Sequence, residues 1–87
     1  MNAIEVANYG LKNGCISFRE RAKEPGQYDV KDWPGGNKRG WTMLDITSAG
    51  AIVAVYNGLN ETNKNKFASL PLIKMAIVAF KLINKVS

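Results

Sequence analysis

Apolar residues recur at helical spacing through the second half of the chain. Directly before this pattern, Thr42 and Asp45 stand three residues apart, which is the form of a capping box. We therefore predict a helix over residues 43–57. The Asn57-Gly58 pair is typical of a left-handed helix end, so the helix is expected to stop there.

Two further helices are expected after that stop. Asn60 has the side chain of a helix N-cap and predicts a short helix over 61–68. Ser69 is expected to cap a last helix over 70–85, with Pro71 in its first turn, where a missing N–H costs nothing.

The first 42 residues have a different pattern. Short segments in which apolar and polar residues alternate lie between residues that favour turns. Residues 15–21 place Ile16 and Phe18 on one side and Ser17, Arg19 and Arg21 on the other. Residues 27–31 place Tyr28 and Val30 together in the same way. This alternation predicts two half-buried strands, joined as a hairpin. The turn formers are Gly10, Gly14, Pro25-Gly26, Pro34-Gly35-Gly36-Asn37 and Gly40.

Together these elements predict an α+β fold in a single domain over residues 1–87. A small N-terminal β-hairpin and a glycine-rich loop (the 1–42 region) pack on a C-terminal helical hairpin (the 43–87 region). A chain of 87 residues is too short for two cores.

The predicted helices carry more apolar surface than one small chain is expected to cover. Residues 49–55 have no polar side chain on any face, and a helix of that kind must be covered on more than one side. We therefore expect the helices to pair with a second copy of the chain, as a homo-oligomer, or to dock on another protein, and the alternative is a tightly wrapped monomer. The residues assigned to self-association are Gly50, Val53, Ile73, Ile77 and Phe80.

Composition excludes most catalytic chemistry. The chain has no histidine, and Cys15 is its one cysteine, so a cysteine-rich zinc site and an intrachain disulfide are both excluded. Cys15 lacks an activating base and is interpreted as a half-buried strand residue. We expect no enzyme activity, no metal and no cofactor.

The segment from Gly35 to Thr42 resembles a phosphate-binding loop but lacks its key residue. Trp41 stands where the phosphate-binding lysine of that motif belongs, so nucleotide hydrolysis is not expected. Lys38 and Arg39 could still hold an anion at a helix start. The interpretation that we favour is a basic loop that ends in Trp41 as a buried core anchor.

The net charge of +5 comes entirely from the last 26 residues, which hold five lysines and no acid. Such a field attracts nucleic acid, an acidic protein surface or anionic lipid, whereas the simpler interpretation is that the lysines solubilise an apolar helix. The first residues do not form a basic segment followed by a long apolar run. We expect a cytoplasmic protein with no membrane contact.

Nucleic-acid binding is an alternative because cations and aromatic side chains mix in the predicted sheet region. Phe18 and Tyr28 are interleaved there with arginines and lysines, although four acids offset much of that charge. The residues assigned to binding, of nucleic acid or of protein, are Arg19, Arg21, Lys23, Trp33, Lys38 and Arg39.

Three segments, 41–45, 51–57 and 66–71, together resemble a pattern in small accessory proteins of bacteriophages. The resemblance covers roughly residues 41–83, about half of the chain, and its motifs are packing motifs. It implies a non-enzymatic inhibitor of a host or defence protein complex, as anti-CRISPR proteins are, which acts in the host cytoplasm. It assigns no role to any residue.

These observations predict a binding protein that occupies a host or defence complex stoichiometrically. A basic nucleic-acid-binding accessory protein and a structural or assembly subunit are the two alternatives.

Overall fold

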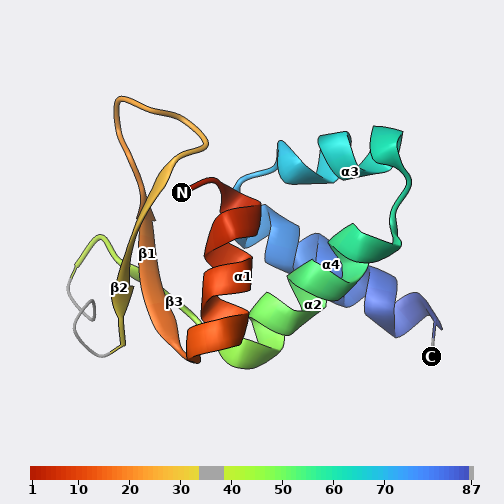
Figure 1. The fold of residues 1–87 in the computed structure, drawn as a ribbon, viewed down its shortest axis with the longest axis horizontal. Coiled ribbons are helices and arrows are strands. Elements are labelled where there is room, and N and C mark those ends of the chain that lie inside the picture. Colours follow the sequence, from red (N-terminus) through yellow and green to blue (C-terminus); the bar gives the residue numbers. More distant parts are fainter. Residues whose placement is uncertain (34–38, 87) are drawn as a thin grey trace.

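The computed structural model describes residues 1–33 and 39–86 and has an α+β fold (Figure 1). An N-terminal helix precedes a three-stranded antiparallel sheet, and three helices follow. The elements are α1 (Ala3–Asn13), β1 (Ile16–Glu20), β2 (Tyr28–Asp32), β3 (Thr42–Leu44), α2 (Ile46–Gly58), α3 (Glu61–Ala68) and α4 (Leu72–Val86).

The predicted hairpin is confirmed as β1 and β2. They pair in antiparallel register with Phe18 opposite Val30. Ile16 and Phe18 are buried on the side of the core, as their alternation predicts. Ser17 departs from the prediction because its side chain, expected on the polar face, is buried as well. Cys15 is half-buried and lies one residue before β1.

The interpretation of residues 1–42 as strands and turns is wrong at its start, where α1 forms. Asn2 caps this helix in a capping box, since its side chain accepts the Glu5 N–H while the Glu5 carboxylate accepts the Asn2 N–H. Gly10, expected in a turn, is buried within the helix. A Cβ at this position would lie 3.3 Å from the Ala49 Cβ, so the missing side chain lets α1 approach α2 closely.

The predicted helix start at residue 43 is also wrong. Thr42–Leu44 form β3, which pairs with the free edge of β1 and places Leu44 opposite Ile16 in the core. Helix α2 begins at Ile46, and its N-cap is Asp45, whose carboxylate accepts the Ser48 N–H. Thr42–Leu44, which the capping pattern placed at the start of the helix, therefore pair with β1 as a strand instead.

The helix ends differ from the prediction in two places, the end of α2 and the start of α4. Gly58 closes α2 without a positive φ, and Leu59 follows in extended conformation, so the left-handed stop is wrong. Asn60 caps α3 as predicted. The last helix begins at Leu72 and not at residue 70, because Ser69 ends α3 and the carbonyl of Pro71 accepts the Met75 N–H of α4.

Helix α2 lies between α1 and α4 and contacts both (Figure 1). Its buried residues Ala49, Ala51 and Ile52 join the core formed with the inner face of the sheet. The first helix thus provides part of the cover for α2 that the sequence pattern assigned to a partner.

Candidate binding surface on the sheet

The strand register gathers a set of polar and aromatic side chains on the face of the sheet that points away from the core. Ile16 and Phe18 point inward, so Ser17 and Arg19 point outward. Ser17 lies opposite both Lys31 and Met43, and Arg19 opposite Asp29. Trp41 directly precedes β3. Extending the β1–β3 register by one residue beyond the pair of Phe18 and Thr42 places Trp41 opposite Arg19. We call Arg19, Asp29, Lys31, Trp41 and Met43 the outer sheet face.

Trp41 is the centre of the outer sheet face. The Arg19 guanidinium carbon lies 4.7 Å from the centroid of the Trp41 ring, and the Lys31 Nζ lies 4.8 Å from it. Because β2 and β3 are the two edge strands of the sheet, a ring that reaches Lys31 from the β3 side crosses β1. The two cations and the ring therefore form one cation–π cluster across the sheet.

Ser17, on the same face of β1 as Arg19, is buried. It lies on β1 between Lys31 and Met43, and its side chain has 0% exposure. Among the described residues, no group forms a hydrogen bond with its Oγ. A buried hydroxyl without a partner costs free energy, so Ser17 is a local cost that other contacts of the fold offset.

Asp29 holds two arginines at the edge of the outer sheet face. Its Oδ1 accepts from the Arg21 Nε at 2.9 Å, and its Oδ2 lies 3.3 Å from the Arg19 Nε. The hydrogen bond from Arg21, followed by the one from Arg19, lowers the pKa of Asp29, and the same contact raises the pKa of Arg21. Asp29 thereby fixes both guanidinium groups and leaves the surface with a net positive charge.

The structure brings some of the predicted binding residues together and separates others. Arg19 and Arg21 lie side by side through Asp29, and Lys23 is exposed in the turn between β1 and β2. Trp33 directly follows β2 with 42% of its surface exposed. Arg39 is exposed, and Lys38 lies outside the described residues.

Sequence reasoning missed Lys31 and Trp41. Trp41 was expected to be a core anchor, and the structure places it half-buried on the outer sheet face instead. Phe18 and Tyr28, which the nucleic-acid interpretation grouped with the cations, are buried on the inner face, where their ring centroids lie 5.9 Å apart in an edge-to-face pair. The available signal for Lys31 was its spacing of two residues from Asp29, which places both side chains on the same face of a strand.

The predicted self-association residues lie on two different surfaces. Ile73, Ile77 and Phe80 are exposed on α4. Val53 lies on α2 and packs partly against the core. Gly50, also on α2, faces α1, since a Cβ there would lie 3.6 Å from the Leu11 Cδ1.

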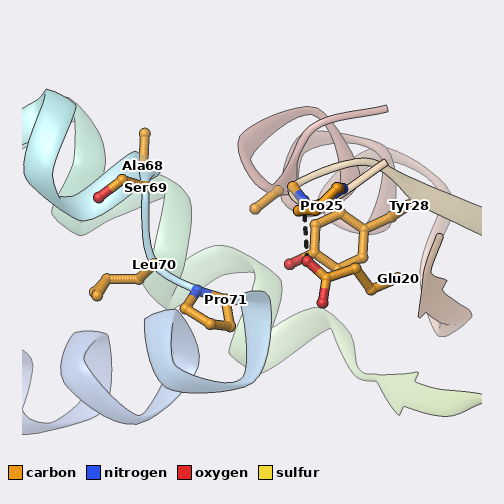
Figure 2. Close-up of a pocket in the computed structure, with 9 residues that line it drawn as sticks. Glu20, Pro25, Tyr28, Ala68, Ser69, Leu70 and Pro71 are labelled. Atoms are coloured by element: carbon orange, nitrogen blue, oxygen red, sulfur yellow. Dashed lines mark hydrogen bonds between the residues drawn. The ribbon is translucent and has the colours of Figure 1, made fainter. Parts of the chain in front are cut away.

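A half-open cleft of about 460 Å³ lies beside the hairpin turn (Figure 2). Glu20, Pro25 and Tyr28 line one wall, and the segment from Ala68 to Pro71 lines the other. One Glu20 carboxylate oxygen accepts the Gly26 N–H at 2.9 Å, so this side chain closes the turn between β1 and β2. The lining mixes polar and apolar surface in similar amounts.

No family model, curated protein or solved structure matches this chain. Within the described residues, no helix is both long and apolar enough to span a bilayer. No group of three or more His, Cys, Asp or Glu side chains in this part of the chain is placed to hold a metal ion.

Proposed function

We propose that this chain is a non-enzymatic binding protein that occupies a protein complex stoichiometrically through its outer sheet face. The observation that carries the proposal is the Trp41 ring, packed against Arg19 and Lys31 on an exposed surface. The resemblance to phage accessory proteins makes a host or defence complex the first class of target to test.

The composition of this surface favours a protein partner. Tryptophan, arginine and methionine are enriched in protein interfaces, and tryptophan and arginine are also enriched among the residues that dominate binding energy. Trp41 and Arg19 lie together here, and Met43 is 48% exposed beside them. The three cations Arg19, Arg21 and Lys31 outnumber the two acids that pair with the arginines, Asp29 and Glu24, so the complementary surface is acidic.

The test is capture of a bacterial protein complex by the tagged chain, followed by measurement of the bound stoichiometry. Lys31→Glu places a carboxylate against the Trp41 ring and reverses one charge of the outer sheet face. Lys66→Glu makes the same charge change at an exposed position on α3. We expect Lys31→Glu to abolish capture and Lys66→Glu to preserve it. Equal capture by both variants would remove the outer sheet face from the proposal.

Single-stranded nucleic acid is a second candidate partner, and the combination of Trp41 with flanking cations favours it. Stacking on an aromatic ring together with phosphate contacts is a common way to bind single strands. Binding of a labelled oligonucleotide that weakens steeply with salt, and weakens further in Lys31→Glu, supports this alternative. Salt-independent retention of the oligonucleotide, or none, argues against it.

A further inference from the structure

Within the described part of the chain, helix α4 packs against the rest of the fold on one side and has exposed apolar side chains on another. Leu72, Met75 and Ala79 are buried, and the helix that α4 packs on is α2. On the other side, Ile73, Ile77 and Phe80 are 55%, 51% and 37% exposed. Their spacing of four and three residues aligns them along one face of the helix. We call these three residues the α4 stripe.

Lysines border the α4 stripe. Lys74 and Lys81 are exposed and fall roughly 80–100° around the helix from Ile73, at 100° per residue. None of the ion pairs among the described residues involves either lysine. The sequence from residue 62 to residue 87 contains no acid, so no neighbouring carboxylate on this segment offsets the two charges.

The positive charge of Lys74 and Lys81 helps to decide which kind of partner can cover the α4 stripe. A second copy of the chain, packed α4 against α4, would place two further lysines at the same interface without adding an acid from this helix. A partner helix with acidic flanks would instead neutralise Lys74 and Lys81 while it covers the apolar side chains. Charge complementarity therefore favours a different protein over a second copy.

We propose that the α4 stripe binds an amphipathic helix of a partner protein, with apolar residues against Ile73, Ile77 and Phe80 and acidic residues against Lys74 and Lys81. This mode of recognition places residues at helical spacing in contact with an apolar surface. The inference rests on the proposed role as a binding protein, but it assigns a surface separate from the outer sheet face.

The first test uses two synthetic amphipathic helices that differ only in flanking charge. Both have leucines at helical spacing, and one has glutamates along its flanks where the other has lysines. We expect the full chain to bind the glutamate helix in a saturable manner, with affinity that falls as salt is raised, and to bind the lysine helix far more weakly. Equal affinity for the two helices, or no binding of the glutamate helix, would overturn the proposal.

Variants of the chain locate the binding surface. Ile77→Ser is expected to weaken binding of the glutamate helix about tenfold or more, because one buried isoleucine contributes that factor. Ile46→Ser on α2 is the matched control, since Ile46 is also 51% exposed, and it should leave binding unchanged. The double variant Lys74→Glu/Lys81→Glu should reverse the preference, so that the lysine helix binds more tightly.

Light scattering separates this proposal from self-association. A monomeric mass for the free chain supports a heterologous partner, whereas a dimeric mass that Ile77→Ser converts to a monomer would assign the α4 stripe to a second copy and overturn the proposal. Lys31→Glu does not alter the α4 stripe and should leave binding of the glutamate helix intact. The outcome for α4 is thus independent of the outcome for the outer sheet face.

Discussion

The Tyr28 hydroxyl accepts the backbone N–H of Leu72 at 3.0 Å, across 44 positions of the sequence. Both residues are almost completely buried. Leu72 is the first residue of α4, and its N–H is one of the amides at a helix start that have no partner within the helix. A strand of the sheet thus satisfies the N-terminus of the last helix and fixes where α4 begins relative to the hairpin.

Tyr28→Phe tests this contact. The variant keeps the ring but leaves the Leu72 N–H buried without an acceptor, which is expected to cost about 1–3 kcal/mol of the free energy of unfolding. In a domain of this size, each kcal/mol corresponds to a fall in Tm of about 4–8 °C. Tyr9→Phe is the matched control, because the Tyr9 hydroxyl donates to the Asp32 carboxylate at the exposed surface. Thermal unfolding should show a clear fall for Tyr28→Phe and little change for Tyr9→Phe.

Ser17→Ala is expected to leave stability unchanged or to raise it by up to about 2 kcal/mol. The buried Ser17 Oγ has no hydrogen-bond partner among the described residues, so its removal discards a desolvated polar group with almost no change in volume. Urea unfolding measures the effect as a shift in the midpoint at constant slope. A loss of more than about 1 kcal/mol would mean that the hydroxyl makes a stabilising contact.

Much of the fold could be predicted from local pattern. The alternation around Phe18 and Tyr28 gave the hairpin, and Asn60 gave the start of α3, because in both cases adjacent residues determine the local structure. Local sequence pattern gave the wrong secondary structure where tertiary contacts determine it. Considered from the sequence alone, Gly10 indicates a turn. In the structure it lies within α1, where the absence of a side chain allows close packing against Ala49 of α2. Thr42 is suited to a helix cap, yet β1 offers it a strand partner.

The candidate surface was less accessible to sequence reasoning than the fold. Arg19 and Arg21 could be identified because they share a predicted strand face. Trp41 could not be placed with them without β3, since only its pairing with β1 brings the ring across the sheet to Lys31. The contact joins residues of β1 and β2 to the residue directly before β3, and the sequence pattern predicted only the first two strands.

Trp41→Leu tests the cation–π cluster in the free protein. Leucine retains apolar cover over the sheet but has no ring to interact with Arg19 and Lys31, so a loss of about 0.5–2 kcal/mol is expected. Trp33→Leu is the control, because Trp33 is exposed just beyond β2 and its replacement should change stability little. Denaturant unfolding of both variants, at low and high salt, makes the comparison. Equal losses in the two variants would contradict a specific role for the Trp41 cluster.

The charge of Asp45 makes the stability of α2 depend on pH. The hydrogen bond from the Ser48 backbone N–H lowers the pKa of Asp45 in the folded protein. A carboxylate with a lowered native pKa contributes stability that is present above about pH 4, the pKa in an unfolded chain, and is lost as pH falls through the native value. Asp45→Asn keeps a capping oxygen but removes this titration.

We therefore expect Asp45→Asn to be less stable than the natural chain by about 0.3–1 kcal/mol at pH 7, because it loses the charge at the helix N-terminus. The difference should shrink as pH falls through the lowered native pKa of Asp45 and close once the aspartate is protonated in the folded protein as well. Asp45→Ala should cost about 1 kcal/mol and retain part of that deficit at low pH, since it has no capping group at all. Urea unfolding across the pH range measures the free energy of unfolding of all three chains. Asp29 titrates equally in each chain, so its contribution cancels from the differences between them. A gap between the natural chain and Asp45→Asn that stays constant with pH would show that the charge of Asp45 does not stabilise α2.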